Sequence, residues 1–108
     1  MAETRRGAAD ETPELRRLRR RIDALDRKIV ALLNERAELA RAVGREKASI
    51  GRRAIRDVER EREVLLRVTM ANTGPTPQAD LLAVYRRLMA VTRALESRDR
   101  ARPDGRNR

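Results

Sequence analysis

The segment LRRLRRRIDALDRKIVALLNERAELARAVGREK, residues 15–47, decides the fold that we expect for this chain. Its apolar residues alternate at spacings of three and four, which predicts a helix with a single apolar seam. Just before the segment, Thr12 and Pro13 have the side chains typical of a helix N-cap and of the first helical position. We therefore predict one helix over about residues 13–47, with a seam made of Leu15, Leu18, Ile22, Leu25, Ile29, Leu32, Leu39 and Val43.

The length of this helix predicts association with a second copy. At 1.5 Å per residue it would be ~50 Å long. A compact domain of this size has a radius of gyration of only ~13 Å. The seam is too long to be buried within its own domain, so we expect at least a dimer.

The rest of the chain predicts two shorter helices, over about residues 55–71 and 77–97. A loop over residues 48–51 precedes the first of them, and the breaker NTGPTP, residues 72–77, separates the two. No alternating strand pattern is present, so the predicted class is all-α. Residues 1–11 and 98–108 carry no apolar periodicity and are expected to be disordered tails on a helical domain of residues 12–97.

Composition excludes several kinds of site. The 108 residues fit one domain and carry a formal charge of +10, which suits nucleic acid, a membrane surface or small carboxylates and phosphates. The chain has no Cys and no His, which excludes disulfides, thiol nucleophiles, Ser-His triads and zinc sites of the usual type. No apolar run approaches the ~20 residues that span a bilayer, and the first residues lack the apolar segment of a signal peptide. We expect a cytoplasmic protein without a membrane partner.

Polar residues interrupt the apolar stripe of the long helix. Arg36 falls at a seam position between Leu32 and Leu39, where a charge is costly unless it is paired. Lys47 lies eleven residues further on, about three full turns and ~16 Å along the same face. The alternative is that Arg36 ends the seam and extends its guanidinium into water.

The two shorter helices show the same change from apolar to polar. In the second helix, Asp57 and Glu61 share a face with Val64 and Val68, and Arg60 lies beside them. In the third, the stripe meets Thr92 and then Glu96. Each of these polar residues also has a simpler explanation. Asp57 could merely favour the helix dipole, and the Arg-Glu pairs could lie on the surface. Thr92 could bond to its own backbone, and Glu96 could be the last exposed residue. Three such events together predict a polar pocket that suits a small anion with several carboxylates and a hydroxyl, acting by positioning and electrostatics.

Three motifs, in order, resemble those of the AroQ-type, all-α chorismate mutases. The long segment contains Ile-Asp-x-Leu-Asp, Leu-Leu-x-Glu-Arg and Gly-x-x-Lys, ending at Lys47. Residues 56–61 read Arg-Asp-x-Glu-Arg-Glu, and residues 85–96 read Tyr-Arg-Arg-Leu-Met-x-x-Thr-Arg-x-Leu-Glu. The resemblance covers residues 15–97. It implies an intertwined homodimer of three-helix protomers that converts chorismate to prephenate for phenylalanine and tyrosine synthesis, with neither cofactor nor metal.

The resemblance also implies roles for individual residues. Arg36, with Arg19 from the other protomer, would hold the substrate carboxylates. Lys47 and Glu96 would meet the ether oxygen from opposite sides, so that Lys47, Glu96 and Arg36 are the expected catalytic residues. The remaining expected contacts are Glu61 and the backbone of Asp57 with the ring hydroxyl, Arg60 near the ring carboxylate, and Thr92 on that carboxylate.

Glu96 replaces a Gln that is common in the family. A Gln amide donates a hydrogen bond at any pH, whereas a Glu donates only when it is protonated. We therefore expect activity to fall as pH rises, and a Glu96→Gln variant to lose that dependence.

Other functions stay open at this point. Aminodeoxychorismate mutases and isochorismate-pyruvate lyases share the fold, although they tend to lack the full Arg-Asp-x-Glu-Arg-Glu motif. A basic helical nucleic-acid-binding protein would explain the positive charge, but not the polar residues inside the apolar stripes. A third possibility is a partner that docks on a larger enzyme of the same pathway, as some family members do.

Overall fold

The computed structural model describes residues 11–53 and 55–102. Most of the two predicted tails, residues 1–10 and 103–108, therefore lies outside the described residues. The contacts divide the chain into two compact units, Met1–Arg36 and Ala37–Arg108, and each is considered by itself.

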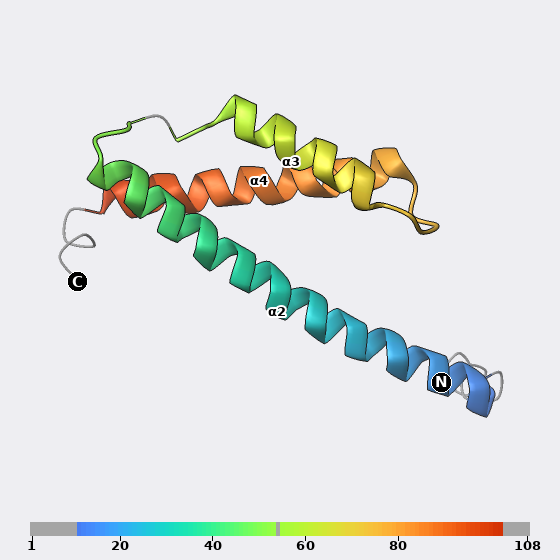
Figure 1. The fold of residues 1–108 in the computed structure, drawn as a ribbon. Coiled ribbons are helices and arrows are strands. Elements are labelled where there is room, and N and C mark those ends of the chain that lie inside the picture. Colours follow the sequence, from blue (N-terminus) through green and yellow to red (C-terminus); the bar gives the residue numbers. More distant parts are fainter. Residues whose placement is uncertain (1–10, 54, 103–108) are drawn as a thin grey trace. The chain divides into compact units, whose positions relative to one another are not determined.

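Three helices make up the described chain: α2, Pro13–Ser49; α3, Val58–Ala71; and α4, Gln78–Ala101 (Figure 1). The described residues contain no strand. The prediction of an all-α chain with one long and two shorter helices is confirmed. Among the described residues, no helix combines the length and the apolarity needed to cross a membrane.

The long helix begins and ends close to where its sequence predicts. The Leu15 backbone N–H donates to the Thr12 hydroxyl at 3.0 Å, so Thr12 is the N-cap and Pro13 begins α2. After Ser49 the chain turns at Gly51, whose φ of +83° lies in the left-handed region that glycine adopts without strain.

In the first unit, the predicted seam of α2 is exposed. The fractional exposures of Leu18, Ile22, Leu25, Ile29 and Leu32 range from 41% to 61%. Each of these side chains is one that a protein normally buries, and together they form the stripe that the spacing of three and four predicts.

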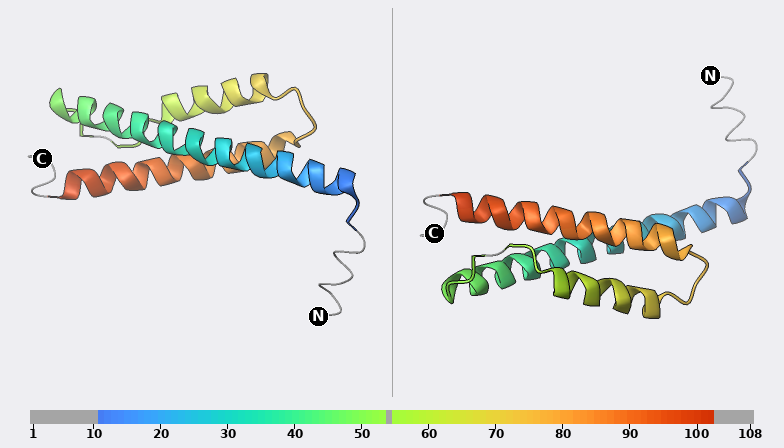
Figure 2. Two further views of the ribbon diagram at one scale, coloured as in Figure 1. Left: turned by 90° about the horizontal axis from the view of Figure 1, so that it is seen from below. Right: turned by 90° about the horizontal axis from the view of Figure 1, so that it is seen from above.

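In the second unit, α3 and α4 pack side by side, and the views in Figures 1 and 2 agree on this. The turn between them is closed by Asn72, whose side-chain amide donates to the Thr76 carbonyl at 3.0 Å and to Gln78 at 2.9 Å. Met89 on α4 is the one hydrophobic residue that is buried among those the structure describes. The second unit therefore has a small apolar core.

Two helix boundaries differ from their predictions. α3 begins at Val58 rather than Ile55, because Asp57 takes the extended N-cap conformation and its carboxylate accepts from the Arg60 backbone N–H at 3.0 Å. α4 continues to Ala101, four residues past the predicted end at Ser97. The sequence prediction for this end was wrong because ion pairs, which apolar periodicity does not report, hold Asp99 and Arg100.

Candidate active site

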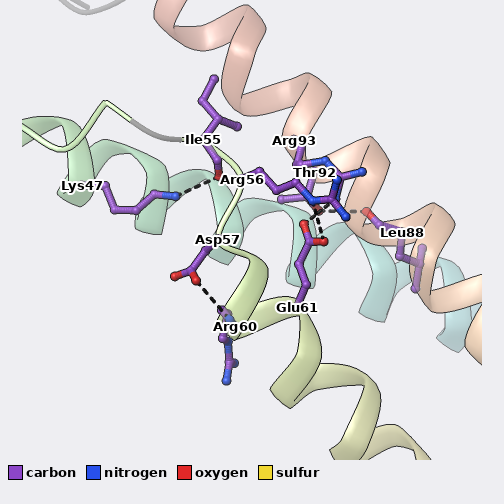
Figure 3. Close-up of polar contacts among 9 residues, drawn as sticks. All are labelled: Lys47, Ile55, Arg56, Asp57, Arg60, Glu61, Leu88, Thr92 and Arg93. Carbon is purple, nitrogen blue, oxygen red and sulfur yellow. Dashed lines mark hydrogen bonds and ion pairs between the residues drawn. The ribbon is translucent and has the colours of Figure 1, made fainter.

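A buried ion pair between Lys47 on α2 and Glu96 on α4 forms the centre of the candidate site. The Lys47 Nζ lies 3.1 Å from the Glu96 Oε2, and the two side chains are 11% and 7% exposed. Lys47 also donates to the Ile55 carbonyl at 3.2 Å (Figure 3). Arg100, one turn beyond Glu96, lies 3.4 Å from the same carboxylate oxygen. The alternative that Glu96 is merely the last exposed residue of its helix is therefore wrong.

Gly44 gives Glu96 the room to lie against α2. A Cβ added at Gly44 would be 2.8 Å from the Glu96 Cγ and 3.0 Å from its Cδ. Real Cβ atoms essentially never approach that closely. A glycine within a helix lowers the helix propensity, but the absence of a side chain at Gly44 lets the Glu96 carboxylate lie beside Lys47, one turn further along α2.

Further ion pairs connect the last turn of α4 to the rest of the second unit. Arg41 donates from Nε and Nη2 to the two oxygens of Asp99, both at 2.9 Å, in the bidentate geometry of the strongest such pairs. These hydrogen bonds lower the pKa of the Asp99 carboxyl and raise that of the Arg41 guanidinium. Arg100 in turn donates to the Arg53 carbonyl at 2.6 Å.

A second polar cluster surrounds Glu61 on α3. Its Oε1 accepts from Arg56 Nε at 3.2 Å, and its Oε2 accepts from Arg93, which reaches across from α4. Figure 3 shows the carboxylate directed at both guanidinium groups. The Glu61 side chain is 15% exposed, so this charge is largely removed from water.

Three other predicted site residues have local partners. The Thr92 hydroxyl donates to the Leu88 carbonyl at 3.0 Å, which leaves its oxygen lone pairs to accept. Asp57 caps α3 and lies 3.7 Å from Arg52. The Arg60 side chain is exposed and pairs with Glu63 at 3.1 Å, directed away from Glu61 (Figure 3).

Two of the predicted substrate-binding residues, Arg19 and Arg36, lie on α2 in the first unit. Arg19 is exposed and pairs with Glu11 at 2.8 Å. Arg36 is half-buried. The structure thus brings Lys47 to Glu96. Asp57 and Glu61 both lie at the start of α3 but have separate side-chain partners, and Arg19 and Arg36 belong to the first unit.

Sequence reasoning missed five residues that shape these clusters. Arg100 had a usable signal, because it is four residues after Glu96 and therefore shares its helix face. Arg93 lies within the motif of residues 85–96, but the prediction selected its neighbour Thr92, which lies on another face of the helix. The others, whose role depends on contacts between helices, are Gly44, Arg41 and Asp99.

The second unit therefore contains both positively charged side chains and carboxylates that accept hydrogen bonds, contributed by α2, α3 and α4. Such a combination of groups can hold an anion and orient a hydroxyl at the same time. Within the described ranges, no group of three or more acidic side chains is placed to hold a metal ion.

Comparison with known proteins agrees with this chemistry. Residues 18–97 match the family model described as chorismate mutase type II. Relatives named "Bifunctional chorismate mutase/prephenate dehydratase" are 37% identical over 89 residues in Aquifex aeolicus and 40% identical over 78 residues in Neisseria gonorrhoeae. These alignments cover 79% and 72% of the chain, respectively, but 24% and 21% of those relatives.

A relative of the same name in Escherichia coli K12 is 51% identical over 51 residues, which is 47% of the chain and 13% of the relative. The chain thus spans about a quarter or less of the length of the relatives it matches. The family match itself extends from the second residue of the predicted seam to the residue after Glu96, and so includes Lys47, Glu61 and Glu96. The chain therefore belongs to the chorismate mutase type II family.

Proposed function

We propose that this chain is a chorismate mutase that rearranges chorismate to prephenate, the step that leads toward phenylalanine and tyrosine. One observation carries the proposal: a lysine and a glutamate from different helices meet in a buried position, 3.1 Å apart, within the segment that matches the family. A buried charged pair is costly to maintain, so its presence favours a functional role.

The proposed mechanism is electrostatic. In this rearrangement the ether C–O bond breaks as a C–C bond forms, and negative charge develops on the ether oxygen. Lys47 stabilises that charge by donating to the oxygen, and Glu96, when protonated, donates from the other side. The 3.1 Å ion pair opens when the ether oxygen enters between the two groups, and both then face the atom on which negative charge develops.

The proposed binding contacts use the surrounding charges. Glu61 and the backbone of Asp57 hold the ring hydroxyl. Thr92 holds the ring carboxylate through its backbone, or through its hydroxyl once that group has released the Leu88 carbonyl. Arg36 holds a substrate carboxylate, with Arg19 of a second copy. The Arg60 side chain is exposed and pairs with Glu63, so it must leave that partner to reach the ring carboxylate.

We also propose that residues 12–97 form one half of an intertwined homodimer. The apolar seam of the first unit is exposed over Leu18, Ile22, Leu25, Ile29 and Leu32. A second copy would cover it with an identical seam, as paired heptad helices do.

The direct test is the loss of chorismate absorbance after the purified protein is added, with prephenate identified as the product. Arg36→Ala should reduce this turnover strongly. Isochorismate and aminodeoxychorismate, incubated in parallel, separate the related activities. The absence of chorismate turnover by the parent across the pH range would overturn the proposal.

A further inference from the structure

Glu61 carries one negative charge, and two positively charged arginine side chains bind it. Arg56 donates to one carboxylate oxygen and Arg93 to the other, so two guanidinium groups surround one carboxylate. The nearby Asp57 carboxylate is directed elsewhere, to the Arg60 backbone N–H at 3.0 Å and towards Arg52 at 3.7 Å. The immediate surroundings of Glu61 therefore carry a net positive charge.

The two arginines differ in burial, and Arg93, which is less exposed, has the stronger electrostatic effect at Glu61. The Arg93 side chain is 30% exposed and that of Arg56 is 62% exposed. Water screens an exposed charge more strongly than a half-buried one. Arg93 also comes from α4 and connects it to α3, so it fixes the orientation of the carboxylate between the helices.

This arrangement limits which donors Glu61 can accept. A carboxylate has about four lone-pair sites, so a neutral hydroxyl can still donate to it beside the two arginines. An ammonium group that reached the same carboxylate would stand within roughly 4–6 Å of both guanidinium groups, where like charges repel appreciably at the effective dielectric of a protein surface.

We propose that Arg93, supported by Arg56, makes the Glu61 site selective for a substrate that carries a neutral hydroxyl over one that carries an ammonium at the same ring position. Arg93 is then a specificity-determining residue that acts through Glu61. The inference rests on the proposed function, and it adds the discrimination of chorismate from aminodeoxychorismate, whose amine is protonated at neutral pH.

The experiment compares the two ligands in one assay. Aminodeoxychorismate is titrated as a competitor of chorismate turnover, and its inhibition constant is divided by the KM for chorismate. Arg93→Met should lower this ratio about tenfold, since one of the two repelling charges is removed. Arg56→Met should lower it less, and Arg93→Lys should keep it near the parent value.

A matched control removes the same charge from the same helix. Arg87 on α4 is exposed, so Arg87→Met should leave the ratio unchanged. Helix content, measured by circular dichroism, shows whether each variant is folded, and a ratio of two ligand constants is insensitive to the fraction of active protein.

The possible outcomes separate the two proposals. If the parent turns over chorismate but Arg93→Met and Arg56→Met both keep its ratio, the specificity role is wrong and the proposed function stands. An equal effect of Arg87→Met would also overturn it, because bulk charge would then be the cause. A parent without chorismate turnover would remove the proposed function and this inference together.

Discussion

Lys47 and Glu96 form an ion pair of 3.1 Å in which neither side chain is more than 11% exposed. They are 49 residues apart in the sequence, and both lie within residues 18–97, the segment that matches the family. Arg100 shares the Glu96 carboxylate, and Gly44 leaves the space in which it lies.

Lys47→Met should reduce chorismate turnover by about 10²–10³-fold, the usual cost of removing a donor aimed at developing negative charge. The variant should also unfold more readily, since Glu96 keeps only Arg100 as a partner. Lys28 is the only other lysine in the chain and is exposed on α2. Lys28→Met is thus the control, and steady-state kinetics with thermal unfolding make the comparison. Equal activity of the two variants would contradict the proposed role of Lys47.

Glu96→Gln should change activity and stability in opposite directions at mildly basic pH. The amide donates to the ether oxygen at every pH, so activity should stay level where that of the parent declines. The same change removes a negative charge from between Lys47 and Arg100, so the midpoint of thermal unfolding should fall. Rate profiles from acidic to mildly basic pH test this, and matching flat profiles for both proteins would show that Glu96 is not a proton donor.

Gly44→Ala should displace Glu96, because the added Cβ would be 2.8 Å from its Cγ. Overpacking of this kind costs about 1–3 kcal/mol of unfolding free energy, and turnover should fall with it. Gly74→Ala makes the same chemical change at a position where nothing lies within 4 Å. The double variant Gly44→Ala/Glu96→Ala should recover the stability lost to the clash. Denaturant unfolding of the parent, Gly44→Ala, Glu96→Ala and the double variant gives that coupling. Strict additivity would show that the glycine serves another purpose.

Asp99→Asn should lower stability at neutral pH but not at low pH. The hydrogen bonds from Arg41 lower the pKa of the Asp99 carboxyl in the folded chain. The pair therefore contributes its full stability above the unfolded-state pKa of about 4, and loses it as pH falls through the lower, folded-state value. Thermal unfolding midpoints of the variant and the parent should converge on acidification. A difference that persists at pH 2 would mean that Asp99 acts through packing rather than charge.

Leu25→Asp should disrupt association, because it places a charge in the middle of the exposed seam of α2. Arg27 lies on the opposite side of the helix, two residues or about 200° away, so Arg27→Asp is a suitable control. Analytical ultracentrifugation over a range of concentrations reports the oligomeric state. A parent that remains monomeric at every concentration would contradict the proposed dimer, whatever the variants do.

Helix boundaries show where local sequence information is sufficient. Thr12 and Pro13 predicted the start of α2 correctly, since capping depends on residues within one turn. The start of α3 was predicted three residues early, although Asp57 carried a cap signal that the polar stretch around it obscured. The end of α4 was missed because Arg41 holds Asp99 and the Arg53 carbonyl holds Arg100, which are contacts between elements.

The sequence alone determined the helical class and the apolar seam, and it pointed to Lys47, Glu61 and Glu96, because periodicities of three and four place side chains on one face of a helix whatever surrounds it. Only the tertiary structure decided which charges meet. Burial and pairing depend on contacts between helices, so only the packed chain shows Glu96 buried against Gly44 and Lys47, and Arg93 bound to Glu61. The physical reason is that helical phase gives the direction of a side chain but not the partner that it finds there.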